Sequence, residues 1–178
     1  MINDKWIIRW REFLSNSYAY GSIIEFLPNN KVQYKNRLMA PGTVLHTWYS
    51  KTNFQATRVE PSLPLIDGEN AYLLTANIEY PSEKHAGAIL RVVFVDRYDN
   101  EFERIIIRDG RGMFKPPITT YSFKIELING GCSEFIFDSL VLQEISEEEF
   151  DAECERIEKN KKYRKKDKKN RRKHSKTQ

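Results

Sequence analysis

The sequence predicts an all-β fold, an antiparallel β-sandwich of the jelly-roll type that is followed by a C-terminal helix and a basic tail. Three observations point to this fold. Short stretches alternate apolar and polar residues, turn residues separate them at regular intervals, and a helical period replaces the alternation only near the C-terminus. With 178 residues and 40% hydrophobic content, the chain is long enough for one domain with a core. We expect the sandwich to cover residues 1–145, and the charged helix and basic tail to cover 146–178.

Strand patterns are clearest in the middle of the chain. Residues 71–80 and 121–128 each place an apolar side chain at every second position, and residues 102–108 also alternate. The run 88–96 is apolar on both faces apart from Arg91, which is typical of a strand inside a sheet. Turn signals separate the strands: Pro28-Asn29-Asn30, Pro41-Gly42, Asp67-Gly68, Pro81-Ser82, Asp99-Asn100, Asp109-Gly110, Pro116-Pro117 and Asn129-Gly130-Gly131. We therefore expect eight or more short strands.

A helix is expected to begin at about residue 146. Ser146 and Glu149 have the spacing of a capping box, and Phe150, Cys154 and Ile157 then share one helical face. Acidic residues fill the first turns and basic residues follow them, an order that suits the helix dipole.

The net charge is divided unevenly along the chain. The formal value of +4 includes a tail from Lys159 to Gln178 with twelve Lys or Arg and one acid, a balance of +11, which leaves −7 for residues 1–158. The tail suits nucleic-acid phosphates, anionic lipid headgroups or an acidic protein, or else it only keeps the chain soluble. An alternative function is therefore nucleic-acid binding through Lys159 to Lys176, although the acidic body argues against extended contact with phosphates.

The chain carries no sign of a membrane segment, a disulfide framework or a metal site. No run approaches the roughly 20 apolar residues of a spanning helix, and charged residues interrupt the N-terminal stretch where a signal peptide would be apolar. Cys132 and Cys154 are the only cysteines and have no CxxC spacing. We expect a cytosolic protein without cofactor or metal.

Catalytic motifs are also missing. There is no nucleophile elbow, P-loop, dinucleotide fingerprint or zinc-protease motif. His46 with Ser50 and a distant acid could be drawn as a triad, and Glu79 with Glu126 as a glycosidase pair, but nothing in the sequence places either set together. Solvated charges mid-strand and a lone histidine near a turn explain these residues equally well. We expect that the protein is not an enzyme.

The stretch from Arg37 to Leu65 is rich in aromatic residues and keeps no regular period for long, and a long ordered loop is uncommon without a function. Flat side chains bury much area at little entropic cost, so sugar-binding and protein-binding surfaces use them. The candidate contacts for a carbohydrate or a partner in and near this stretch are Tyr18, Tyr20, Trp48, Tyr49 and Phe54. The alternative is that Trp48 and Phe54 close one end of the core while Tyr18 and Tyr20 are half-buried strand residues.

Prolines near the end of this stretch favour an extended chain. Pro61 and Pro64 fix their own backbone angles and exclude a helix. Leu63 and Leu65 are then expected to anchor the segment to the body.

The stretch SYAYGSIIEFLPNNKVQYKNRLMAPGTVLHTWYSKTNFQATRVEPSLPL, residues 17–65, closely resembles the small third protein of the accessory Sec system of Gram-positive bacteria. The likeness lies in Tyr20-Gly21, the NRLMAPG turn, the WYS triplet, Arg58 and PSLPL, and it continues more loosely to about Ile145. The closing segment SEFIFDSLVLQEI is also similar to the last strand of many carbohydrate-binding modules.

The resemblance implies a noncatalytic subunit with a β-sandwich like that of a carbohydrate-binding module. Such a subunit works in the cytosol with the first and second accessory Sec proteins, and helps to modify serine-rich-repeat glycoprotein adhesins and deliver them to a motor ATPase. The implied role here is to bind those partners and the adhesin, with Trp48 and Tyr49 facing a partner or sugar and Arg58 supplying directional hydrogen bonds. The basic tail would allow contact with the inner membrane face.

Overall fold

The computed structural model describes residues 4–10, 16–51, 61–81 and 87–159. The chain divides into two compact units, Met1–Glu144 and Ile145–Gln178. The first unit is built from β-strands, and the described part of the second is mainly a helix over residues 147–159. Among the described residues, no helix combines the length and the apolar character needed to span a bilayer.

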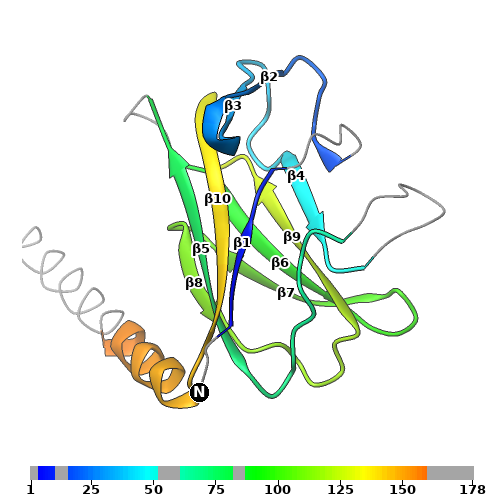
Figure 1. Cartoon of the computed structure of the whole chain (residues 1–178), viewed down its shortest axis with the longest axis vertical. Helices are drawn as coiled ribbons and strands as arrows, with labels where there is room; N and C mark the ends of the chain where they lie inside the picture. The colour runs from blue at the N-terminus through cyan, green and yellow to red at the C-terminus, as the bar shows by residue number, and fades with distance from the viewer. Residues whose placement is uncertain (1–3, 11–15, 52–60, 82–86, 160–178) are drawn as a thin grey trace, which may run out of the picture. The chain divides into compact units, whose positions relative to one another are not determined.

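One sheet of the first unit contains six strands. Its order is β2-β3-β10-β5-β8, and β1 also pairs with β10 (Figure 1). The bounds of these strands are Lys5–Ile8 for β1, Ile23–Phe26 for β2, Val32–Lys35 for β3, Ala71–Glu79 for β5, Arg111–Phe114 for β8 and Glu134–Ile145 for β10. The long strand β10 pairs antiparallel with β3 along its first residues and with β1 further on, where Phe135 is opposite Tyr34 and Leu142 is opposite Trp6.

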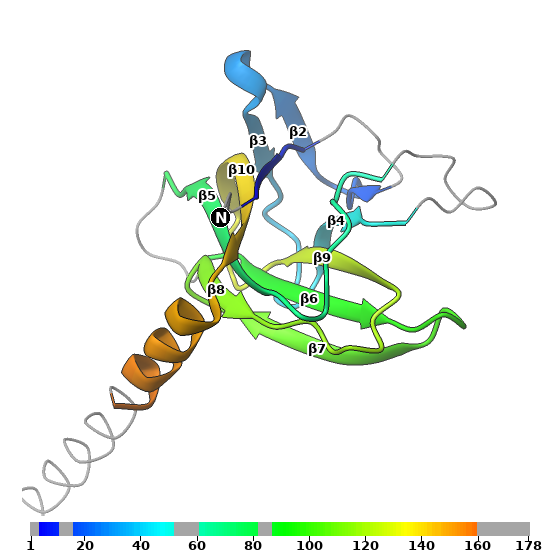
Figure 2. The same cartoon turned by 60° about the horizontal axis from the view of Figure 1, so that its bottom comes forward.

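The second sheet contains four antiparallel strands in the order β4-β9-β6-β7. Their bounds are Val44–Tyr49 for β4, Ile89–Val95 for β6, Glu101–Ile107 for β7 and Ser122–Ile128 for β9. Figure 2 shows the strands of this sheet stacked beside one another. A short 3₁₀ turn, η2 (Pro28–Asn30), connects β2 to β3, and Asn29 adopts a φ of 65° there.

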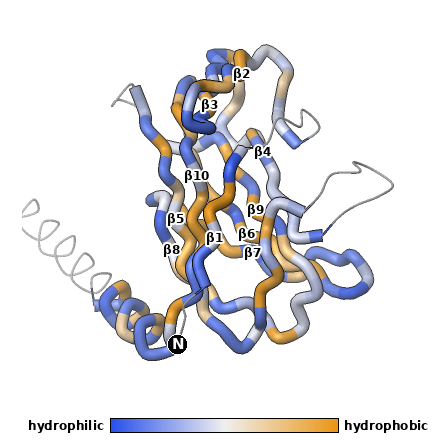
Figure 3. The backbone as a smooth tube through the Cα atoms, viewed as in Figure 1, coloured by the Kyte–Doolittle hydropathy of each residue, from blue (hydrophilic) through white to orange (hydrophobic). Residues whose placement is uncertain are grey.

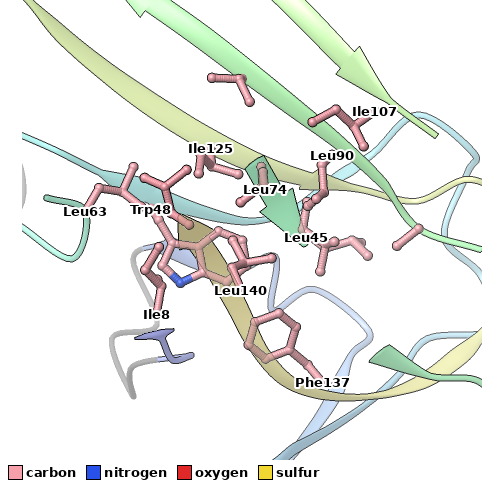
Figure 4. Close-up of a cluster of buried hydrophobic side chains, with 14 of the residues drawn as sticks. Ile8, Leu45, Trp48, Leu63, Leu74, Leu90, Ile107, Ile125, Phe137 and Leu140 are labelled. Carbon is pink, nitrogen blue, oxygen red and sulfur yellow. The ribbon is translucent and has the colours of Figure 1, made fainter. Parts of the chain in front are cut away.

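A single core lies between the two sheets. Side chains from both sheets form one buried cluster, to which Leu74 and Phe137 contribute from the first sheet and Leu90 and Ile125 from the second (Figure 4). Figure 3 shows hydrophobic segments along the central strands and hydrophilic ones in many of the connecting turns. Two packed antiparallel sheets around a shared core are a β-sandwich, so the predicted fold class is confirmed.

The strands predicted from alternation are present, with the expected faces. In β9, Phe123, Ile125 and Leu127 point into the core, and β6 lies between β9 and β7 as its two-sided apolar pattern predicted. The capping box is also formed, because Ser146 N–H donates to Glu149 Oε2 and Glu149 N–H donates to Ser146 Oγ, each at 3.2 Å.

The description of residues 37–65 as lacking a regular period is wrong for part of that stretch, because β4 lies within it. The strand is hard to detect because its register shifts between Val44 and His46, a β-bulge that breaks the period of two. Three successive residues, Leu45, His46 and Thr47, are consequently all buried.

Candidate partner-binding surface

Two turns from the N-terminal part of the chain are joined by one buried side chain. The Nδ2 atom of Asn36 donates to the carbonyl of Tyr20 at 3.0 Å and to the Ser22 hydroxyl at 2.9 Å. Its Oδ1 atom accepts the amide of Leu38 at 3.0 Å. Residues 18–22 and 36–38 therefore form one hydrogen-bonded unit.

Tyr34 supports the same unit from the core. Its ring is buried and stacks on Phe135 at a centroid distance of 5.1 Å, while its hydroxyl lies 2.9 Å from the Tyr18 carbonyl and 2.8 Å from the Ser22 hydroxyl. Burial is the main cause that raises the pKa of Tyr34, so this hydroxyl remains a proton donor at neutral pH. Gly21 has a φ of 67°, which is why a glycine suits the turn.

Asn129 fixes the other end of the 36–42 turn. Its backbone amide donates to Thr43 O at 2.8 Å, and its carbonyl accepts the Gly42 amide at 2.7 Å. Its side chain also points at this turn, with Nδ2 lying 3.4 Å from the carbonyls of Met39 and Ala40. The turn is thus held at both ends by buried asparagines.

Large apolar side chains project from this rigid frame. Tyr20 is 85% exposed and Leu38 is 94% exposed, and Ile23, two residues beyond Gly21, is also exposed. We call Tyr20, Ile23 and Leu38 the turn surface. Apolar groups held in water by a rigid backbone are a frequent mark of an interaction site. Sequence reasoning selected Tyr20 but missed Ile23 and Leu38, although Leu38 lies in the NRLMAPG turn that carried the resemblance.

Trp48 belongs to the core and is not part of any exposed surface. Its side chain is 1% exposed, stacks on Phe137 at 5.4 Å, and donates from Nε1 to the Arg9 carbonyl at 3.0 Å. The prediction that Trp48 faces a partner or sugar is wrong for this structure, and the alternative that it fills the core is correct. The cause is strand direction: Trp48 is opposite Ile125, which points inward.

The remaining candidates are divided between the surface and the part outside the described residues. Tyr18 and Tyr49 are both a little over one third exposed, and Tyr49 is opposite Lys124 on the outer face of the second sheet. Phe54 and Arg58 lie outside the described residues. The structure thus does not gather the six predicted contacts into one patch within the described residues.

The PSLPL segment is attached through Leu63 but not through Leu65. The Leu63 side chain is buried, and the amides of Ser62 and Leu63 donate to the Tyr49 carbonyl at 3.0 and 3.1 Å. Leu65 is 85% exposed, so the expectation that it anchors the segment is wrong.

His46 and Ser50 do not form a catalytic pair. His46 is buried, stacks on Trp10 at 4.3 Å, and its Nδ1 atom lies 2.7 Å from the hydroxyl of Ser17, which also accepts the Trp10 Nε1 proton. Burial lowers the pKa of His46 to about 3. The Ser50 hydroxyl instead accepts the Phe123 amide at 2.8 Å.

The two candidate glycosidase carboxylates are in different sheets. Glu79, in β5, pairs with Lys31 at 2.7 Å. Glu126, in β9, is buried, contrary to the expectation of a solvated charge, and pairs with Arg91 and with Lys124. Across the described residues, no group of three or more His, Cys, Asp or Glu side chains could hold a metal ion.

The class of protein follows from the sandwich and from the turn surface: this is a β-sandwich protein that offers a preformed surface to other molecules. The chain belongs to the accessory Sec secretory system ASP3 family, whose model matches residues 17–144. An accessory Sec system protein of the same ASP3 name, from Streptococcus gordonii, is 38% identical over 133 residues, which cover 74% of this chain and 82% of that protein. By this family assignment the chain is a noncatalytic component of the accessory Sec system.

Two solved structures contain similar chains. A crystal structure of accessory secretory proteins 1, 2 and 3 in Streptococcus pneumoniae matches with a TM-score of 0.73 and 28% identity, over 82% of this chain and 100% of that chain. A Glycosylation Associate Protein (Gap123) complex from Streptococcus agalactiae matches with a TM-score of 0.73 and 32% identity. This second match covers 80% of this chain but only 45% of that chain.

The Asn36 frame can be tested by substitution. We expect Asn36→Ala to lower the free energy of unfolding by about 1–3 kcal/mol, because the Tyr20 carbonyl and the Leu38 amide lose their shared partner. Chemical denaturation of the full chain measures this change. Glu25→Ala, on the exposed neighbouring strand β2, is the control and is expected to change stability by less than about 0.5 kcal/mol. Equal stability of the two variants would contradict the assigned role.

Proposed function

We propose that this protein is an assembly subunit of an accessory Sec complex and binds the first and second accessory Sec proteins through the turn surface. The observation that carries the proposal is the exposure of Tyr20, Ile23 and Leu38 on turns that buried side chains hold in place. Because the frame is already ordered, a partner loses little entropy in fixing it, and the apolar area contributes to affinity. The surface also lies within the residues matched by the family.

The partners are proposed from the relatives. The Streptococcus pneumoniae structure contains accessory secretory proteins 1, 2 and 3, and a similar assembly for this chain would bury the turn surface. Tyr18 is included in the proposed contact because its backbone belongs to the same hydrogen-bonded unit.

The wider role is proposed on the family resemblance. In this role the subunit acts in the cytosol and also binds a serine-rich-repeat glycoprotein, whose modification and delivery to the accessory motor ATPase it supports. Tyr49 is retained as a candidate contact, as are Phe54 and Arg58, which lie outside the described residues. Attraction of Lys159 to Lys176 to anionic lipids is a further proposal and also concerns residues outside those described, apart from Lys159 itself.

Leu38→Asp is expected to weaken binding to the first and second accessory Sec proteins at least about tenfold, because a carboxylate would have to lose its water at an apolar contact. Titration calorimetry of the full chain against the two copurified partners measures the affinity. Leu65→Asp is the matched control, since Leu65 is exposed to a similar degree but lies outside the turn surface.

Thermal melts of both variants verify that the fold is retained. Unchanged affinity in Leu38→Asp, and also in Tyr20→Ala, would rule out the turn surface. If Leu65→Asp weakens binding and Leu38→Asp does not, the interface lies on the PSLPL side of the domain.

A further inference from the structure

A hollow of about 700 Å³ lies at one end of the second sheet, and no residue of the turn surface lines it. Residues 96–98 and Phe102, from the hairpin between β6 and β7, line it together with residues 118–121, which precede β9. Its volume is within the range of about 300–1,000 Å³ that is usual for small-molecule sites. The two segments are more than ten residues apart in the sequence, so only the fold brings them together.

Both segments are fixed before any ligand arrives. The Asp96 carboxylate accepts the amides of Tyr98 at 2.8 Å and Asn100 at 2.9 Å, which closes the hairpin turn. The Tyr121 amide donates to Val95 O and the Thr120 amide to Pro117 O, both at 2.9 Å. The second of these bonds orders the loop, and the first attaches it to the hairpin.

Aromatic and aliphatic side chains are nevertheless left in water around the hollow. Tyr98 is 75% exposed and Ile118 is 89% exposed, and Tyr121 and Phe102 are also exposed. A cation lies against each tyrosine: the guanidinium of Arg97 is 5.9 Å from the Tyr98 ring centroid, and Lys51 Nζ is 5.4 Å from the Tyr121 ring centroid. These contacts favour defined positions for the two rings.

One polar group at the hollow is unsatisfied. Thr120 Oγ1 is the buried side-chain oxygen or nitrogen that has no hydrogen-bond partner among the described residues. Buried polar groups are normally paired, and an exception often marks a functional position. Rotation about the Cα–Cβ bond of Thr120 would let this hydroxyl meet a polar ligand.

We propose that this hollow is a saccharide-binding site. A sugar ring has an apolar C–H face, which packs on a tyrosine ring, and a rim of hydroxyls, which Thr119, Thr120 and Arg97 can hydrogen-bond. An extended peptide suits the hollow less well, because peptides in such sites bind largely through main-chain hydrogen bonds. Here the amides of Tyr98, Thr120 and Tyr121 already have partners.

This inference deepens the proposed contact with a glycosylated protein and rests on that part of the proposed function, but not on the turn surface. It assigns sugar recognition to side chains that are separate from the partner-binding residues. The two assignments therefore fail independently. Loss of sugar binding with intact complex assembly removes this one alone, and the reverse result removes only the turn surface.

The test uses the ¹⁵N-labelled full chain, titrated with glucose, galactose, mannose and N-acetylglucosamine up to about 50 mM, a range suited to weak, millimolar sites. At least one sugar is expected to shift the amide signals of residues 96–102 and 118–121 in a saturable way. Tyr98→Ala and Tyr121→Ala are each expected to weaken that binding at least about fivefold. Tyr20→Ala, an equally exposed tyrosine on the turn surface, is expected to leave it unchanged.

Three results would overturn the proposal. The first is that none of the four sugars shifts these signals, and the second is that Tyr98→Ala and Tyr121→Ala bind the sugar as well as the unchanged chain. The third is that the first or second accessory Sec protein, and no sugar, shifts the signals at this hollow, which would make it a protein contact. Because both tyrosines are largely exposed, the variants are expected to keep the fold, and a thermal melt verifies this.

Discussion

Trp48→Ala is expected to lower the free energy of unfolding by about 3–5 kcal/mol, the usual cost of removing a large aromatic side chain from a core. The indole packs against Trp10, His46 and Phe137, and its Nε1 proton satisfies the Arg9 carbonyl. The substitution therefore leaves a cavity between the sheets and an unpaired acceptor at its edge. A loss of this size is a large part of the roughly 5–15 kcal/mol that stabilises most domains.

Urea denaturation followed by circular dichroism measures this loss. Tyr49→Ala is the matched control, because Tyr49 is the next residue of the same strand, with its side chain on the outer face. We expect a change of less than about 1 kcal/mol for it. If Trp48→Ala were as stable as Tyr49→Ala, the indole would not be in the core, and its assignment as a surface contact would have to be reinstated.

Acid is expected to destabilise the protein through His46. Its pKa is about 3 in the folded state because of burial, against 6.5 ordinarily, so below pH 6.5 the unfolded chain takes up a proton that the folded chain does not. The resulting loss of stability begins near pH 6.5, grows by about 1.4 kcal/mol for each pH unit, and approaches about 5 kcal/mol near pH 3. Above pH 6.5 the ring is neutral in both states and this contribution is complete.

Carboxylates that are paired in the folded state also lose their contributions in acid, so the His46 effect has to be isolated by difference. The stability of the unchanged chain and of His46→Gln is measured by urea denaturation between pH 7.5 and pH 4. The free-energy difference between the two is expected to move in favour of His46→Gln by about 1.4 kcal/mol per unit below pH 6.5. Parallel pH profiles would show that His46 titrates normally and is open to water.

The sheet strands could be predicted from the sequence wherever one face is buried and the other is wet. β9 is the clearest case, since Phe123, Ile125 and Leu127 enter the core at every second position. β4 could not be predicted in this way, because its bulge and its burial on both faces remove the alternation. β8 resembles a turn in the sequence for a different reason: it is only four residues long and begins directly after the Gly110 turn.

The candidate surfaces could be predicted only in part. An aromatic-rich stretch indicates that flat side chains are needed, but the sequence does not reveal which of two adjacent residues points inward, so Trp48 and Tyr49 could not be distinguished. Leu38 gave no signal by composition, because its exposure depends on the hydrogen bonds that Asn36 makes to two separate turns. The hollow beside Tyr98 and Tyr121 was missed for a similar reason, since each of its two loops has an ordinary turn sequence.

The pairing of β10 has a consequence for how the protein is made. β1 and β3 leave the ribosome early, yet each finds its neighbour in β10, roughly a hundred residues later in the chain. The first sheet therefore cannot close until synthesis is almost complete, and until then its N-terminal strands present open edges to other nascent chains. Folding of this protein is thus a late, largely post-translational event, with a period of exposure in which a chaperone or an assembly partner has time to act.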